Sequence, residues 1–142
     1  MKTRFMALGL FGMALVSACG GFAGPYGYAE NVSSACPRDT IIHRLTRLKA
    51  TGRYDHPYSF PDGPDSYPAN HVFYFFSQPH NRILHVVVTP GFDKTSALYL
   101  VSVKEPRPES SWKDFNHGLD RQLQKAITTW FYAEINPFLQ CK

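Results

Sequence analysis

The residues best placed for acid–base chemistry gather in a short segment near the C-terminal end of the chain. They are Asp114, His117, Asp120 and Arg121. A helix through this segment would bring residues three and four positions apart onto one region of its surface, where a carboxylate could orient the His117 imidazole as a general base. The same spacing is typical of ion pairs on a solvated helix face, and we favour that interpretation.

The histidines and cysteines lack the spacing of a metal site. The chain has 6 histidines and 3 cysteines but no H-E-x-x-H or C-x-x-C motif. His71 and His85 could approach each other across a hairpin, yet two ligands do not close a zinc site, and His80 has no neighbouring acidic motif. A G-x-S-x-G motif and a phosphate-binding glycine loop are also absent from the sequence. The sequence thus indicates no catalytic residue, no metal ligand and no cofactor.

Residues 1–18 have the organisation of a bacterial export signal. Lys2 and Arg4 give a positive start, and residues 5–16 form an uncharged apolar run. The run is shorter than the roughly 20 residues of a membrane-spanning helix, so we predict a signal peptide that is removed. Without it, 13 of the 15 lysines and arginines remain against 11 acidic residues. So mild a positive charge does not indicate a nucleic-acid partner.

The end of this leader, VSAC over residues 16–19, resembles the lipobox of bacterial lipoproteins. In that family the cysteine receives a diacylglycerol and becomes the new N-terminus, so the resemblance implies lipidation of Cys19 and a membrane anchor. It also implies periplasm-facing attachment to the outer membrane, because Gly20 stands where an aspartate commonly signals retention in the inner membrane. The alternative is simple secretion after cleavage behind Ala18, since the general signal peptidase accepts valine and alanine at these positions.

The number of cysteines bears on the same question. Three cysteines leave one thiol unpaired in an exported chain. Lipidation of Cys19 removes the odd thiol and leaves Cys36 and Cys141 as a pair, so we predict a disulfide between them. Closing a loop of about 100 residues stabilises a domain by roughly 4.7 kcal/mol through the lost entropy of the unfolded chain.

The mature chain divides into a lipidated tether over residues 19–35 and a single domain over residues 36–142. Residues 20–34 are rich in glycine and other turn-forming residues and have no apolar periodicity, which predicts a flexible coil. For the whole chain, 44% apolar and 18% charged residues are typical of one globular domain.

A first amphipathic helix is predicted near the start of the domain. Its apolar stripe consists of Ile41, Ile42, Leu45 and Leu48. These residues recur at helical spacing. Asp39 or a preceding serine could cap the start of this helix, and Gly52 is placed to end it, because glycine accepts the left-handed conformation beyond a last turn.

Three runs rich in valine, tyrosine, phenylalanine and leucine predict strands over residues 71–76, 83–89 and 97–104. The connections are short enough for hairpins, so we expect an antiparallel meander. The middle run is apolar at both odd and even positions, which requires cover on both faces of the sheet. A helix would cover one face, and the remaining helix, the loop over residues 53–70 or another protein would cover the second.

The most regular pattern predicts a long helix near the C-terminus. Apolar residues recur every three or four positions from Phe115 to Ile135. Ser111 and Asp114 have the spacing of a capping box. Asn136-Pro137 would stop the helix after about 24 residues.

Residues 53–70, which we call the proline loop, carry prolines at positions 57, 61, 64 and 68 that exclude a helix or a central strand. Four aromatic residues accompany them: Tyr54, Tyr58, Phe60 and Tyr67. Long irregular segments in small domains are often functional, and an aromatic surface stiffened by proline loses little entropy on binding. We therefore predict these four residues as candidates for binding a partner. The alternative is that the rings cover an open side of the core.

Together these patterns predict an α+β fold of order helix, three-stranded antiparallel meander and long C-terminal helix, in a single disulfide-stapled domain. Leader, size and element order resemble those of small envelope lipoproteins that assist secretion or outer-membrane assembly machines, including secretion pilotins. The resemblance implies a non-enzymatic binding or accessory subunit of an envelope complex, with a protein partner and a lipid anchor. One alternative is a periplasmic inhibitor or immunity lipoprotein that blocks an enzyme through a protruding loop. A small hydrolase or carbohydrate binder, dependent on His117, is the least favoured hypothesis.

Overall fold

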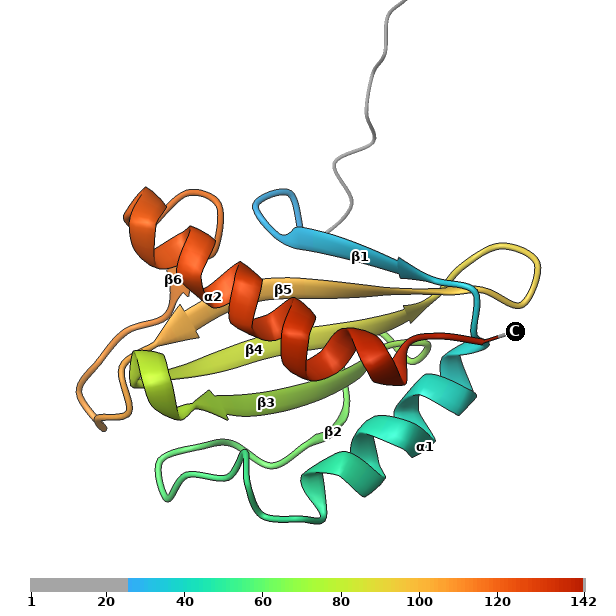
Figure 1. The fold of residues 1–142 in the computed structure, drawn as a ribbon, viewed down its shortest axis with the longest axis horizontal. Helices are drawn as coiled ribbons and strands as arrows, with labels where there is room; N and C mark the ends of the chain where they lie inside the picture. Colours follow the sequence, from blue (N-terminus) through green and yellow to red (C-terminus); the bar gives the residue numbers. More distant parts are fainter. Residues whose placement is uncertain (1–25, 142) are drawn as a thin grey trace, which may run out of the picture.

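A computed structural model describes residues 26–141; the leader, Cys19 and the first part of the tether lie outside this range. The described chain forms a six-stranded antiparallel sheet and two α-helices (Figure 1). The strands are β1 (Glu30–Ser34), β2 (Gly63–Pro64), β3 (His71–Ser77), β4 (Arg82–Pro90), β5 (Ser96–Lys104) and β6 (Lys113–Asp114). The helices are α1 (Arg38–Lys49) and α2 (Arg121–Ile135), with short 3-10 helices η1 (Gln78–His80) and η2 (Asn136–Phe138). The predicted α+β class is confirmed.

The predicted meander forms the centre of the sheet. Strands β3, β4 and β5 are neighbours in space as well as in sequence, and their bounds lie within one residue of the predicted runs. Between β4 and β5 the register shifts at His85/Val86. The shift leaves Val101 of β5 without a partner in β4, so Leu100 and Val103 both reach the core although they are three positions apart.

The prediction of only three strands is wrong, because three further strands add to the edges. Strand β1 falls within the predicted tether and pairs with β5 over five residues. Strand β6 pairs with Ser102 and Val103, further along the same edge of β5, and β2 pairs with the start of β3. These additions are polar or very short, and long-range pairing rather than local apolar alternation determines them.

Helix α1 begins at Arg38 with Pro37 at its N-cap. No side chain caps this end, so the predicted capping by Asp39 or a serine is wrong; Asp39 lies in the first turn, where an acidic residue favours the positive end of the helix dipole. Gly52 follows the end of the helix with φ of 75°, the left-handed conformation expected of it.

Helix α2 is shorter than predicted. It has 15 residues and begins at Arg121, ten positions after the predicted start. The Asp120 side chain accepts hydrogen bonds from two backbone N–H groups of the first turn and is the true N-cap. Upstream of it, Phe115 is fully buried from a turn, so its helical spacing with the apolar residues of α2 arises without a helix.

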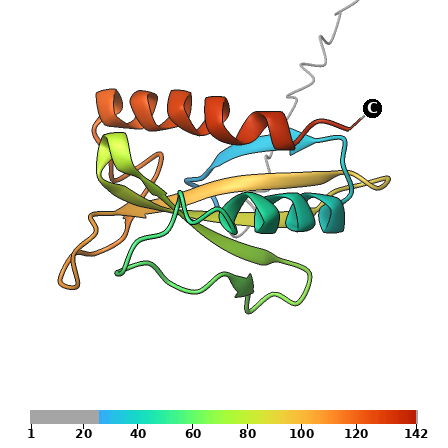
Figure 2. The same cartoon turned by 60° about the horizontal axis from the view of Figure 1, so that its bottom comes forward.

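Both helices pack against one face of the sheet. Ile41 and Leu45 of α1 and Ile127 and Phe131 of α2 belong to a single buried cluster with strand residues such as Phe75. Figure 2 shows α2 above the sheet and the proline loop with β2 below it. We call the face turned away from the helices the far face. Its cover comes from the proline loop, the segment before β6 and the residues before β1.

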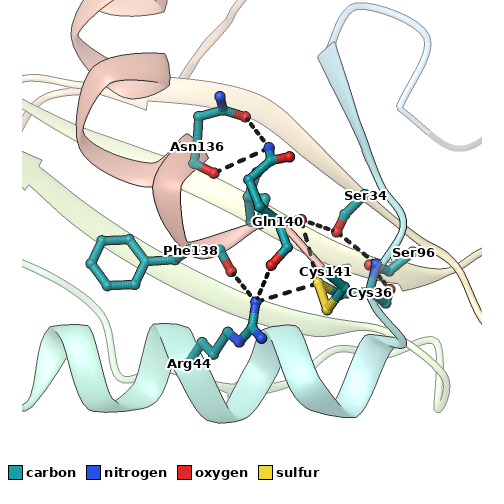
Figure 3. The surroundings of a disulfide bond; sticks show 9 residues. Ser34, Cys36, Arg44, Ser96, Asn136, Phe138, Gln140 and Cys141 are labelled. Atoms are coloured by element: carbon teal, nitrogen blue, oxygen red, sulfur yellow. Dashed lines mark hydrogen bonds between the residues drawn. A yellow bond between two sulfur atoms is a disulfide. The ribbon is translucent and has the colours of Figure 1, made fainter.

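The predicted disulfide is present between Cys36 and Cys141, which are 105 positions apart (Figure 3). Hydrogen bonds hold the chain on both sides of it. The Ser34 hydroxyl donates to the Leu139 carbonyl at 2.6 Å, and Arg44 Nη1 donates to the Gln140 carbonyl at 2.8 Å. The C-terminal segment is therefore fixed between β1 and α1. Within residues 26–141, no helix has the length and apolar character needed to cross a membrane.

Candidate functional site: a tyrosine cleft on the far face

The residues that we considered for acid–base chemistry do not lie on one helix. Asp114 lies in β6, while Asp120 caps α2. His117 lies in the turn between them, where its ring packs against Tyr28 with centroids 4.6 Å apart. The helix surface that would have placed a carboxylate beside the His117 imidazole is thus not formed.

The histidines do not converge either. His71 and His85 point to opposite faces of the sheet, because His71 shares the core side of β3 with Phe73 whereas His85 stacks on Tyr74 on the far face. Burial lowers the pKa of His85, and its Nδ1 lies 3.3 Å from Ser102 Oγ. Within the described part of the chain, no three His, Cys, Asp or Glu side chains are grouped as metal ligands.

The four predicted partner-binding residues occupy different environments. Tyr54 is only 2% exposed and belongs to the core, where its ring packs edge-on against Phe75 and Trp130. Tyr58 is exposed and lies near His56. Tyr54 is therefore no part of an exposed surface, and its aromatic character serves the core.

Phe60 covers the middle of the far face. Its ring lies 5.4 Å from Tyr74 and 5.9 Å from Trp112, measured between centroids. The Lys104 ammonium lies 5.5 Å from the same ring. Asp62 secures this part of the proline loop, because its Oδ1 accepts a hydrogen bond from the Tyr74 backbone at 2.8 Å. Phe60 is nevertheless 46% exposed, so its ring covers Tyr74 and Trp112 and also presents a surface to solvent.

Of the four predicted aromatic residues, Tyr67 is the one that lines the cleft described next. The cleft has a volume of about 450 Å³ and a mostly apolar lining. Its lining residues are Tyr26, Tyr67, Pro68, Ala69, Asn70, Thr89, Pro90 and Tyr99. We call it the tyrosine cleft. Tyr67 is 56% exposed, and the rings of Tyr26 and Tyr99 pack together with centroids 5.5 Å apart.

A hydrogen-bonded group holds one wall of the cleft in place. The Tyr26 hydroxyl donates to Asp65 Oδ2 at 2.7 Å and accepts a hydrogen bond from Asn70 Nδ2 at 3.2 Å. Burial and the Asp65 carboxylate raise the pKa of Tyr26 to about 12, and the hydrogen bond from Tyr26 lowers the pKa of Asp65. This wall is therefore preorganised for a ligand, with the Tyr26 ring turned to the cleft and its polar tip satisfied.

Sequence reasoning found one of the three tyrosines of the cleft. Tyr26 fell in the predicted tether and Tyr99 in a predicted strand, and sheet pairing brings both to Tyr67. The sequence signal for Tyr26 and Tyr99 was the presence of tyrosines outside the predicted apolar stripes of the helices. No protein family, curated protein or solved structure matches the chain.

Proposed function

We propose that the protein is a lipoprotein anchored through Cys19 at the outer membrane, facing the periplasm, and that it binds a protein of an envelope secretion or assembly complex. The tyrosine cleft is the binding site in this proposal. The single observation that carries it is the concave, apolar lining of Tyr26, Tyr67 and Tyr99 on a domain in which a disulfide joins the segment after β1 to the C-terminal segment.

The chemistry of the cleft suits a short polypeptide segment. Tyrosine offers a large contact area for only two rotatable side-chain bonds, and proline is rigid, so both lose little conformational entropy on binding. A cleft of about 450 Å³ has room for a few side chains of an extended chain. The hydroxyl groups of Tyr67 and Thr89, which line the cleft, can hydrogen-bond to its backbone.

Site-specific photo-crosslinking in intact cells tests this proposal. A photoreactive phenylalanine derivative at position 67 should give a discrete adduct with one envelope protein. The same derivative at Tyr132, an exposed residue of α2 in the helix layer, should not give that adduct. Equal labelling of the same protein from positions 67 and 132 would remove the cleft as the site.

Substitutions in the cleft supply a quantitative form of the test. Ala69→Arg places a bulky charged chain in the cleft, and Tyr67→Ala removes an exposed ring, so each should weaken capture of the crosslinked protein at least tenfold. Both positions are exposed, and the melting temperature should not change. Tyr132→Ala is the matched control and should leave capture unchanged. The inhibitor alternative predicts a single enzyme as partner, whose activity falls when the purified protein is added.

A further inference from the structure

The connection between β4 and β5 extends beyond the end of the sheet (Figure 1), and it contains Phe92. Phe92 is 93% exposed. The turn that carries it is hydrogen-bonded, since Gly91 N donates to the Thr95 carbonyl at 2.9 Å and Thr95 N donates to the Phe92 carbonyl at 3.0 Å. An added Cβ at Gly91 would lie 2.3 Å from Thr95 Oγ1, so a side chain at this position would force Thr95 to move. The fold therefore holds an apolar ring outward on a well-defined turn.

The surface from this turn to the tyrosine cleft is continuous. A second hollow of about 560 Å³ is lined by Phe92, Ala97 and neighbouring residues, and it shares Thr89, Pro90 and Tyr99 with the cleft. An apolar strip thus runs from Tyr67 past Pro90 to Phe92, along one end of the far face.

The N-terminal chain enters the domain on the same strip. Tyr26, the first described residue, packs against Tyr99. Cys19 precedes Tyr26 by seven residues, which span at most about 25 Å. Ser96 is the first residue of β5 after the turn, and Tyr99 lies three residues further along the strand, about 10 Å away. A lipid on Cys19 would therefore keep the strip within a short distance of the bilayer surface.

We propose that Phe92 inserts into the interface of the bilayer that holds the lipid anchor, and that the tyrosine cleft consequently opens beside the membrane surface. The inference rests on the proposed lipidation of Cys19. Transfer of a phenylalanine ring out of water is favourable, and tyrosine rings favour the headgroup level of a bilayer. One ring binds a membrane weakly from solution, but the tether makes the contact intramolecular and raises the effective concentration of the surface.

This position of the cleft limits the class of protein that can bind in it. A cleft held beside the bilayer meets segments that emerge from the membrane, such as the first residues beyond an anchored or membrane-embedded part of a protein. The partner segment therefore belongs to a membrane-associated protein.

Tryptophan quenching in vesicles tests the insertion. The fully processed lipoprotein is reconstituted in vesicles of phosphatidylethanolamine and phosphatidylglycerol with or without brominated acyl chains, which quench nearby tryptophan. Phe92→Trp adds a reporter at the turn, and Tyr132→Trp adds a matched reporter on α2, on the other side of the sheet. Unsubstituted protein gives the background from Trp112 and Trp130. We expect at least twice the background quenching for Phe92→Trp and background quenching for Tyr132→Trp.

Equal quenching of the two reporters would overturn the inference. The mass of the N-terminal peptide from the same sample separates this failure from failure of the proposed function. A lipid on Cys19 with an unquenched Phe92→Trp overturns membrane insertion alone, whereas an unmodified Cys19 overturns the anchor and the insertion together. Shielding of Phe92→Trp that requires an added envelope protein, in vesicles where it is otherwise unquenched, assigns the turn to a protein contact and also overturns the inference.

Discussion

The Tyr54 hydroxyl donates a hydrogen bond to Glu134 Oε2 at 2.6 Å and so joins the start of the proline loop to α2. Arg53 donates to the other oxygen of the same carboxylate at 3.0 Å. Burial and this carboxylate raise the pKa of Tyr54 to about 12. The Tyr54 side chain is therefore fixed in the core, whereas Arg53 before it is exposed.

Removing that hydroxyl should destabilise the domain. We expect Tyr54→Phe to lower the free energy of unfolding by about 1.5–3 kcal/mol, the net contribution of a hydrogen bond to a charged group. Tyr58→Ala, in the exposed part of the same loop, should stay within about 0.5 kcal/mol of the unsubstituted protein. Urea unfolding measures both, and a Tyr54→Phe protein as stable as the parent would contradict this role.

Substitution of Phe60 should lower the stability of the domain, whereas substitution of Tyr67 should not. Phe60→Ala uncovers Tyr74 and Trp112 and should cost about 1–2 kcal/mol of stability, because the ring is half-buried against them. Tyr67→Ala should leave the melting temperature unchanged while it weakens partner capture. The opposite pattern in thermal unfolding would return Phe60 to the binding surface and make Tyr67 structural.

The start of α2 can be tested with two aspartates. Asp120→Ala removes the side chain that caps the helix and should cost about 1 kcal/mol. Asp114→Ala removes an exposed side chain from β6 and should change stability by less than about 0.5 kcal/mol. If Asp114→Ala proves the more damaging in chemical denaturation, the helix begins earlier than the structure places it.

Stability should fall in mild acid because of His85. Burial lowers the pKa of the folded imidazole below the value of about 6.5 found in an unfolded chain. Between the two pKa values the unfolded chain binds more protons, so the free energy of unfolding decreases as the pH falls through about 6.5 and below, until the folded imidazole is also protonated. His71 and His80 shift in the same direction and add to the slope.

His85→Gln removes one of these titrating groups. Comparison of urea unfolding at neutral and mildly acidic pH should show a smaller loss of stability for the variant than for the parent. Identical losses would mean that His85 is protonated as readily in the folded protein as in the unfolded chain.

The disulfide should supply a large share of the net stability. Replacing Cys36 and Cys141 together by serine opens a loop of 105 positions and should cost about 4–5 kcal/mol. Arg44→Ala, which removes hydrogen bonds to the C-terminal carbonyls but keeps the bridge, should cost less. A double-serine protein that unfolds at the same urea concentration as the parent would assign the closure of the domain to these hydrogen bonds.

Local patterns in the sequence predicted the parts of the fold that local physics determines. The runs of β3, β4 and β5 have β-branched and aromatic residues with hairpin-length connections, and the stripe around Leu45 has helical spacing. The start of α2 was missed because Phe115 continues its apolar spacing from a turn. Strand β1 was missed because its residues are mostly polar and pair with a strand more than sixty positions away.

For the candidate site, too, only the part that depends on local sequence could be predicted. Tyr67 was predicted from the composition of the proline loop, which is a local property. Tyr26 and Tyr99 reach it through the pairing of β5 with its neighbours and the fold of the chain before β1, which no local spacing reports. Tyr54 was assigned to binding because an aromatic ring near prolines has the same appearance in the sequence whether it faces solvent or the core.

The Cys36–Cys141 bridge also limits how far tension on the tether can unravel the domain. Force applied upstream of Tyr26 first loads residues 26–35, including the pairing of β1 with β5. If β1 detaches from β5, residues 26–35 can extend to at most about 35 Å. Beyond Cys36 the load divides between the main chain and the bridge to Cys141, so the closed ring that carries both helices and the meander does not lengthen freely. The domain can therefore release one edge strand under tension and keep its core.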